Sequence, residues 1–302
     1  MTDFDAYLMV DWSASNKPNK REDSIWYCML MRTSKGCSLC PPQNPATRQE
    51  AFTRIRNLLL ENIERKLSTL VSFDFPYGYP SGFASALRLK RSKHRPKWRQ
   101  VWNTISQLVK DSEANRNNRF EVGEQLNKKL SGGRHPFWGH PQGVKLPLLS
   151  ACKPGEHLAM PFCEKRITEQ RVTKAQPVWK LAYPGAVGSQ ALIGIPYVAR
   201  LRDDRALARH SRLWPFETGL RKLPSRAKRK WFVLHAEIYP SIIKVTPGKG
   251  EVKDAAQVRA LARHFAQLDK EGSLQAFFEG PGDLSQQQRR LVEREEGWIL
   301  GV

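Results

Sequence analysis

Residues 69–76 read TLVSFDFP, a continuous apolar run that ends in an aspartate, one more aromatic residue and a proline. An apolar run without polar alternation is typical of a strand that is covered on both faces of its sheet, as central parallel strands are. Proline lacks the backbone donor that a strand needs, so we expect the strand to stop before Pro76. The sequence therefore predicts a central strand over residues 69–75, with Asp74 near its carboxyl end.

Two other apolar runs end in the same way. Residues 7–11 read YLMVD and precede a polar loop, and residues 231–240 read WFVLHAEIYP. Each predicts a buried strand with a carboxylate at or near its carboxyl end, Asp11 in the first and Glu237 in the second. In open α/β sheets, ligands bind beyond the carboxyl ends of the strands. We therefore expect both carboxylates to share one rim of the sheet with Asp74.

The remaining periodic segments complete an α/β order. Residues 24–32 and 37–40 predict two strands joined by a tight turn, which indicates a hairpin. Apolar residues spaced by three or four predict helices over residues 47–67 and 254–268. The chain thus runs as three strands, a helix, a strand, a long irregular middle part, a strand and a helix. Within the middle part, helices are predicted over residues 97–110 and over residues 188–201, the latter with a break at Pro196.

Carboxylates at one rim repel one another unless a cation neutralises them. Asp254 opens the last predicted helix on the side of its apolar stripe, so it can lean over the strand ends. Ligands that are all oxygen favour hard ions such as Mg²⁺ or Mn²⁺. The predicted set of metal ligands and catalytic residues is Asp11, Asp74, Glu237 and Asp254. Local roles remain open alternatives, because Asp11 and Asp74 can start turns and Asp254 can cap its helix together with Gln257.

The chain of 302 residues carries 50 Lys and Arg against 29 Asp and Glu, a net charge of +21. Residues 76–230 hold 31 of the basic residues and 10 of the acidic ones, so the excess lies in the middle. Such segregation is typical of proteins that bind nucleic acid, and Trp98 and Trp102 could stack on unpaired bases. A solvated basic surface is the alternative. The predicted nucleic-acid contacts are Arg91, Lys93, Arg95, Lys97, Arg99, Lys228, Arg229 and Lys230.

These segments resemble the ribonuclease-H-like superfamily, whose fold runs as three antiparallel strands, a helix, a strand, further helical matter, a strand and a last helix. More narrowly, they resemble a family of uncharacterised proteins thought to be nucleases of this fold. In that family a further Asp often stands near the start of the last helix, where this chain has Lys253. The motifs that carry the resemblance are Val10-Asp11-Trp12-Ser13, Phe73-Asp74-Phe75-Pro76-Tyr77-Gly78, Glu237-Ile238-Tyr239-Pro240 and Asp254-Ala255.

The resemblance covers residues 5–82 and 230–270. It implies a ribonuclease-H-like mixed sheet built from residues 1–76 and 231–302, with residues 77–230 as a large basic insertion between the fourth and fifth strands. It also implies a nuclease in which Asp11 is bound to both of two divalent ions. The other three carboxylates share the remaining ligand positions. Two alternatives stay open: a nucleic-acid-binding protein without catalysis on the same fold, and a small-molecule phosphoryl-transfer enzyme.

Three smaller constellations are less specific. The loop HPFWGH, residues 135–140, offers two histidines that could assist a leaving group, although a packed aromatic turn is the commoner use of such a loop. Glu217 follows an aromatic run and is a candidate extra member of the site. A zinc site is conceivable from four cysteines, although buried free thiols are the commoner explanation. These are Cys37, Cys40, Cys152 and Cys163.

Five cysteines are few for a disulfide framework, which fits a reducing compartment. The first residues lack the basic and then apolar pattern of a secretion signal, and no apolar stretch is long enough to span a membrane. We therefore expect a cytoplasmic protein that does not enter membranes. The sequence contains no signal for an oligomeric state.

Overall fold

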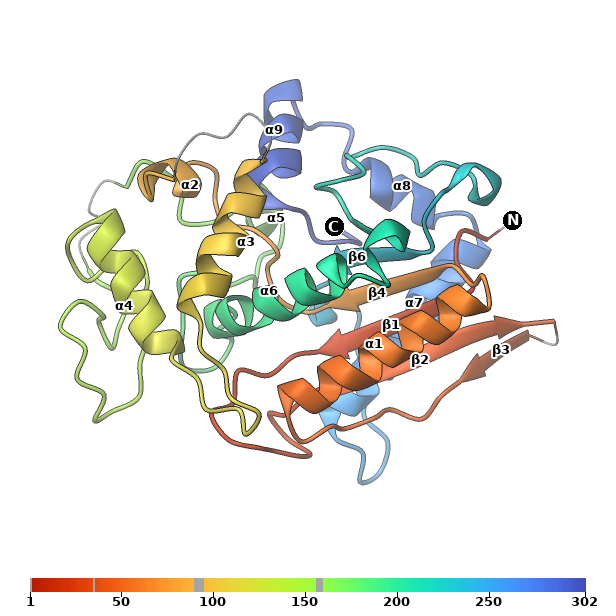
Figure 1. The fold of residues 1–302 in the computed structure, drawn as a ribbon, viewed down its shortest axis with the longest axis horizontal. Coiled ribbons are helices and arrows are strands. Elements are labelled where there is room, and N and C mark those ends of the chain that lie inside the picture. Colours follow the sequence, from red (N-terminus) through yellow and green to blue (C-terminus); the bar gives the residue numbers. More distant parts are fainter. Residues whose placement is uncertain (1, 35, 90–94, 156–159) are drawn as a thin grey trace.

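The computed structural model describes residues 2–34, 36–89, 95–155 and 160–302. Within these ranges the chain builds one mixed sheet with the strand order β3-β2-β1-β4-β6-β5 (Figure 1). The first three strands are antiparallel neighbours, whereas β4, β6 and β5 run parallel to β1. The strands are β1 (Ala6–Asp11), β2 (Trp26–Thr33), β3 (Gly36–Leu39), β4 (Thr69–Phe73), β5 (Ser211–Leu213) and β6 (Val233–Glu237).

The three apolar runs form the centre of the sheet, as the sequence predicts. β1 pairs with β4 and β4 pairs with β6, all in parallel. In this register Val10 lies opposite Phe73, and Phe73 lies opposite Glu237. Because Asp11 and Asp74 are the residues that follow Val10 and Phe73, both carboxylates stand at the same rim of the sheet.

Helices cover both faces of the sheet, which explains the lack of polar alternation in its central strands. Leu8 and Val10 of β1 face α1 (Arg48–Glu64), α3 (Lys97–Leu108) and α6 (Gly188–Asp203). Tyr7 and Met9 face α7 (Lys253–Lys270) and α8 (Leu274–Glu279). Figure 1 shows α1 and α6 in front of the sheet and α7 behind it.

Short helices complete the structure. They are α2 (Phe83–Ala86), α4 (Arg119–Leu130), α5 (Ile167–Gln170), α9 (Gln286–Leu291), a π-helical turn (Val292–Glu296) and three 3-10 helices (Ala208–His210, Arg226–Lys228 and Pro240–Ile242). In the part of the chain that is described, none of the helices has the length and apolar character needed to cross a membrane.

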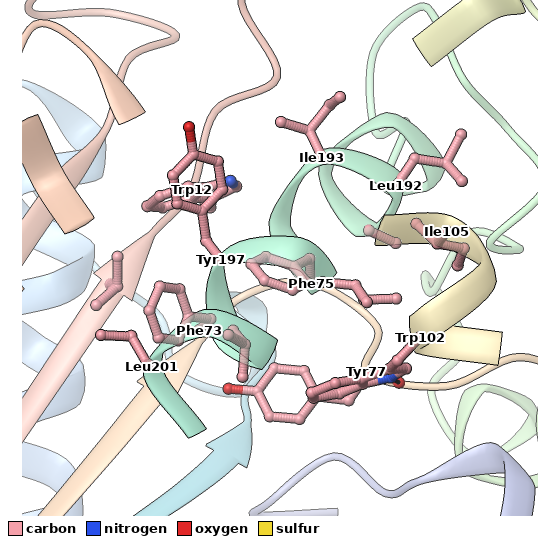
Figure 2. Packing of buried hydrophobic residues seen from close by; sticks show 14 of the residues in the cluster. Trp12, Phe73, Phe75, Tyr77, Trp102, Ile105, Leu192, Ile193, Tyr197 and Leu201 are labelled. Carbon is pink, nitrogen blue, oxygen red and sulfur yellow. Dashed lines mark hydrogen bonds between the residues drawn. The ribbon is translucent and has the colours of Figure 1, made fainter. Parts of the chain in front are cut away.

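The middle part of the chain, residues 77–230, shares its core with the sheet. Trp98 and Trp102 of α3 belong to the same buried cluster as Val71 and Phe73 of β4. Figure 2 shows α6 passing Phe73 and Phe75, with Trp12 and Tyr197 alongside and with Trp102 of α3 next to Tyr77. One continuous hydrophobic core therefore joins the middle part to the strands that carry the carboxylates.

Two features of the middle part differ from the sequence-based prediction. The helix over residues 188–203 continues through Pro196 without a break. It is buried along most of its length, so its packing outweighs the hydrogen bond that proline removes. The strand β5 was not predicted, because three residues give no periodic pattern and only pairing with β6 makes them a strand.

Candidate active site

Asp11 and Asp74 meet at the ends of two adjacent parallel strands. Oδ1 of Asp74 accepts a hydrogen bond of 2.7 Å from the backbone N–H of Trp12. The parallel register of β1 and β4 places the two carboxyl groups next to each other, and the charge of Asp74 acts on Asp11. Asp74 thus bonds across the sheet to the end of the strand that carries Asp11.

Buried aromatic side chains fix this pair of carboxyl groups. Trp12 follows Asp11, and Phe73 and Phe75 flank Asp74; each of the three is about 1 % exposed. The ring of Trp12 lies 5.6 Å from that of Phe73 and 6.5 Å from that of Phe75 (Figure 2). Rings packed in this way hold the backbone on both sides of each carboxylate, so the pair is pre-positioned.

Burial and neighbouring negative charges disfavour ionisation of both groups. The pKa of Asp11 is raised well above its ordinary value by burial, and then by the negative charges of Asp74 and Asp254. Burial raises the pKa of Asp74 to about 7, although the Trp12 N–H opposes the shift. A cation placed between them would remove this penalty, because it favours the ionised forms.

Two further aspartates line the same cleft. Asp254 stands in the first turn of α7, and Asp23 lies in the loop between β1 and β2. The cap of α7 is Val252, which makes no side-chain capping bond, so Asp254 does not serve as the helix cap. Burial raises the pKa of Asp254, and the charge of Asp23 adds to the shift. Asp23 was not predicted from the sequence, because it lies in a polar loop without a motif.

Glu237 has a different partner. The guanidinium of Arg166 reaches both of its oxygens, with Nη1 2.8 Å from Oε2 and Nη2 2.5 Å from Oε1. The backbone N–H of Tyr77 donates to Oε2 at 2.9 Å. Glu237 is 2 % exposed, does not line the cleft, and is already neutralised by Arg166. The structure therefore does not bring it together with Asp11, Asp74 and Asp254.

The cleft has a volume of about 700 Å³ and lies beyond the carboxyl ends of β1 and β4. Besides the aspartates, its lining includes Arg119, Lys174 and Tyr183 of the middle part. Sequence reasoning missed all three. Arg119 and Lys174 lie outside the dense basic clusters, and the only local signal near Tyr183 is the turn-forming Pro184-Gly185 that follows it.

Most of the predicted nucleic-acid contacts do not face this cleft. Three of them pair with carboxylates elsewhere: Lys97 with Glu295, Arg99 with Asp203 and Arg229 with Asp3. Lys228 and Lys230 are exposed but directly precede β6, so they lie at the opposite end of the sheet from the carboxylates. Arg95 lines a separate pocket beside Trp98. Arg91 and Lys93 lie outside the described residues.

The two tryptophans near the first basic cluster are core residues. Trp98 and Trp102 are 4 % and 0 % exposed. Their rings pack against each other and against Phe216. The expectation that they stack on bases is therefore wrong, because α3 turns its apolar face, tryptophans included, toward the core.

Within the described residues, Glu217, the loop 135–140 and the four cysteines do not form the functional sites considered for them in the sequence. Glu217 pairs with Arg202 through two contacts of 2.8 Å and does not line the cleft. In the loop 135–140, Phe137 is fully buried, which is the packed aromatic turn. Cys37, Cys152 and Cys163 are exposed free thiols and Cys40 is partly exposed, and no described group of three His, Cys, Asp or Glu holds them as a metal site.

The donor chemistry of the cleft fits a hard divalent ion. Among the described residues, no three His, Cys, Asp or Glu side chains already surround one point. Mg²⁺ does not need three, because it is commonly bound by one or two carboxylates together with water and substrate phosphates. Asp11 and Asp74 supply such a pair. Because both are buried without a cationic partner in the described part of the chain, binding of a metal ion would stabilise their ionised forms.

Comparison with protein families, with curated proteins and with solved structures found no match to this chain.

Proposed function

We propose that the chain is a divalent-metal-dependent phosphodiesterase that acts on nucleic acid, with Asp11 and Asp74 as the principal metal ligands. One observation carries this proposal: the two carboxyl groups stand together at the ends of adjacent parallel strands, in a cleft that also contains Arg119 and Lys174. Arg119 bonds to neutral side chains, and neither Arg119 nor Lys174 is in an ion pair within 4 Å among the described residues. A phosphodiester bound through a metal ion complements both kinds of side chain.

The roles of the protein groups follow from their positions. When bound, Mg²⁺ or Mn²⁺ would activate water and neutralise charge that develops on the phosphate. The Trp12 N–H orients Asp74 at 2.7 Å. Asp254 and Asp23 line the same cleft and add negative charge around the ion. Glu237 is outside the ligand set that we propose, because both of its carboxylate oxygens are bonded to Arg166.

The order of the structural elements supports a ribonuclease-H-like relationship. Three antiparallel strands, a helix, a parallel strand, a further parallel strand and a last long helix follow one another as β1, β2, β3, α1, β4, β6 and α7. The short strand β5 is an addition at the edge beside β6. In that fold class a carboxylate site at the ends of these strands suits metal-dependent cleavage.

The test is cleavage of labelled single-stranded DNA, duplex DNA, RNA and RNA–DNA hybrid with Mg²⁺ or Mn²⁺. Asp11→Asn and Asp74→Asn should each abolish cleavage. Asp203→Asn is a matched control. The first turn of α6 lines the cleft, whereas Asp203 is the last residue of this helix and lies far from the cleft. Cleavage that survives both changes at the paired carboxylates would overturn the proposal.

The same panel separates the two alternatives. Salt-sensitive binding by all proteins without any cleavage would favour a nucleic-acid-binding protein on this fold. Metal-dependent hydrolysis of a small phosphodiester, but of no nucleic acid, would favour a small-molecule phosphoryl-transfer enzyme.

A further inference from the structure

Tyr183 is unusual among the aromatic residues of this protein. Its side chain is 50 % exposed, and it is the one large hydrophobic residue among those described that is exposed to this degree. It lines the same cleft as Asp11 and Asp74. Of the other aromatic residues that line the cleft, Trp12 is buried in the core, and Phe120 and Tyr239 are partly buried.

The backbone at Tyr183 is in an unfavourable conformation. Its φ is +74°, in the left-handed region that a bulky side chain rarely adopts. The surrounding contacts hold it there. The hydroxyl of Tyr183 donates to the carbonyl of His140 at 2.8 Å, and Nζ of Lys180 donates to the carbonyl of Pro184 at 2.8 Å. Strain that the surroundings maintain at a cleft is typical of functional positions.

Arg119 supplies a second, independent indication. Its Nε donates to Oγ of Ser189 at 3.1 Å, and its Nη1 donates to Oδ1 of Asn117 at 2.8 Å. These neutral partners fix the guanidinium but do not neutralise it. Burial and the nearby charge of Arg48 lower the pKa of Arg119 to about 10, so the group is desolvated but still charged near neutral pH. A positioned guanidinium of this kind suits a phosphate.

We propose that this part of the cleft is a nucleotide subsite, in which one unpaired base stacks on Tyr183 while Arg119 and Lys174 contact its phosphates. The proposal rests on the proposed function, and it narrows the substrate to single-stranded nucleic acid. Stacking needs an open base face, and bases within a duplex already stack on their neighbours. An exposed aromatic ring beside cationic side chains is the arrangement that single-strand-binding sites use.

The experiment measures binding by fluorescence anisotropy in EDTA, so that no metal-dependent cleavage occurs. The probes are a labelled short oligothymidylate, an abasic oligonucleotide of the same length, and a blunt duplex. Tyr183→Ala should weaken oligothymidylate binding by roughly tenfold, as expected for the loss of one stacked base. It should leave binding of the abasic probe unchanged. Because Tyr183 is exposed and strained, we expect Tyr183→Gly to fold at least as stably as the wild type and to lose the same binding.

Loss of the cationic contacts should affect binding differently from loss of the Tyr183 ring. Arg119→Gln and Lys174→Ala should weaken binding of the base-containing and abasic probes equally, and should reduce the dependence of binding on salt. Lys270→Ala is the matched control, since Lys270 is exposed at the last residue of α7, at the opposite end of that helix from Asp254, and it should change little.

The outcomes distinguish this proposal from the proposed function. If Tyr183→Ala weakens both single-stranded probes alike, or neither, the stacking subsite is wrong, whatever the cleavage assay shows. If the duplex binds as tightly as oligothymidylate, the restriction to single strands is wrong. If no nucleic acid is cleaved but the Tyr183 effect depends on the base, the subsite stands and the catalytic proposal fails.

Discussion

Arg166 contacts both carboxylate oxygens of Glu237 inside the protein, and neither side chain is accessible to solvent beyond a few per cent. Arg166 also binds Glu169 at 2.8 Å and the carbonyl of Glu296 at 2.8 Å. A segment of the middle part is thereby joined to the end of β6. Because of this pairing, Glu237 is the one of the four predicted carboxylates that already has a cationic partner among the described residues.

Replacement of Arg166 by Met should be strongly destabilising. It would leave Glu237 and Glu169 buried without a counter-charge, a loss of about 3–5 kcal/mol. Chemical denaturation of the purified variant measures this. Lys153→Met is the control, because it removes an exposed ion pair with Glu164 and should cost at most about 1 kcal/mol. Equal effects of the two substitutions would mean that the Arg166 network does not stabilise the fold.

Replacement of Asp11 by Asn should stabilise the metal-free protein. It removes a carboxyl group whose charged form is disfavoured by burial and by its neighbours. We therefore expect the metal-free variant to melt at a higher temperature than the wild type at neutral pH. Thermal melts should also show that Mn²⁺ stabilises the wild type much more than the variant, because binding to the folded state adds stability.

Two controls accompany that measurement. Asp203→Asn and Glu237→Gln should both keep a melting-temperature shift with Mn²⁺, the latter because Glu237 is bound by Arg166. If Asp11→Asn keeps the full melting-temperature shift with Mn²⁺, or if Glu237→Gln alone loses it, the ligands that we propose are wrong.

His235 should make the protein sensitive to acid. It is fully buried in β6, and burial together with the charge of Arg202 lowers its pKa to about 3. The unfolded chain binds the proton more readily, with a pKa near 6.5. The contribution of His235 to stability is therefore complete above about pH 6.5 and is lost as the pH falls toward about 3.

Urea denaturation across this pH range tests the assignment. His235→Leu should reduce the loss of stability on acidification, whereas His140→Leu, at a more accessible position, should not. An unchanged pH profile in His235→Leu would show that other groups dominate acid unfolding.

Replacement of Gly194 by Ala should disturb the support of the site. A Cβ atom at this position of α6 would lie 2.3 Å from Cζ of Phe75, the residue after Asp74. Overpacking of this kind costs about 1–3 kcal/mol, against a gain in helix propensity of about 1 kcal/mol. Calorimetry should show a lower melting temperature for Gly194→Ala, and the double variant with Phe75→Leu should lose less than the sum of the single changes. Strict additivity would argue against this contact.

The sequence predicted the central strands and their carboxylates well, because the signals are local. Apolar runs ended by Pro76 and Pro240 mark buried strands, and parallel pairing then brings Asp11 and Asp74 to one rim. The partner of Glu237 could not be predicted in the same way. Arg166 lies in a segment without periodicity, and only the folded middle part brings it to β6.

Charge counting was the least informative signal. The net charge of +21 describes the whole chain, but it does not reveal which basic residues meet carboxylates after folding. Arg229 is paired with Asp3, which is distant in sequence, whereas Arg119, outside the dense clusters, has neutral partners and faces the cleft. Partner choice is a property of tertiary structure, so the positions of the uncompensated cations become visible only there.

The continuous core that joins residues 77–230 to the sheet affects how this protein can change over evolution. Gly194 of α6 lies directly against Phe75, and Trp102 packs against Tyr77, which in turn packs against Phe75. A change of side-chain volume in the middle part is therefore transmitted to the backbone that carries Asp74, since closely packed interiors transmit strain. The middle part cannot diverge freely as an appended module would, and its substitutions must be compensated by substitutions beneath the carboxylates.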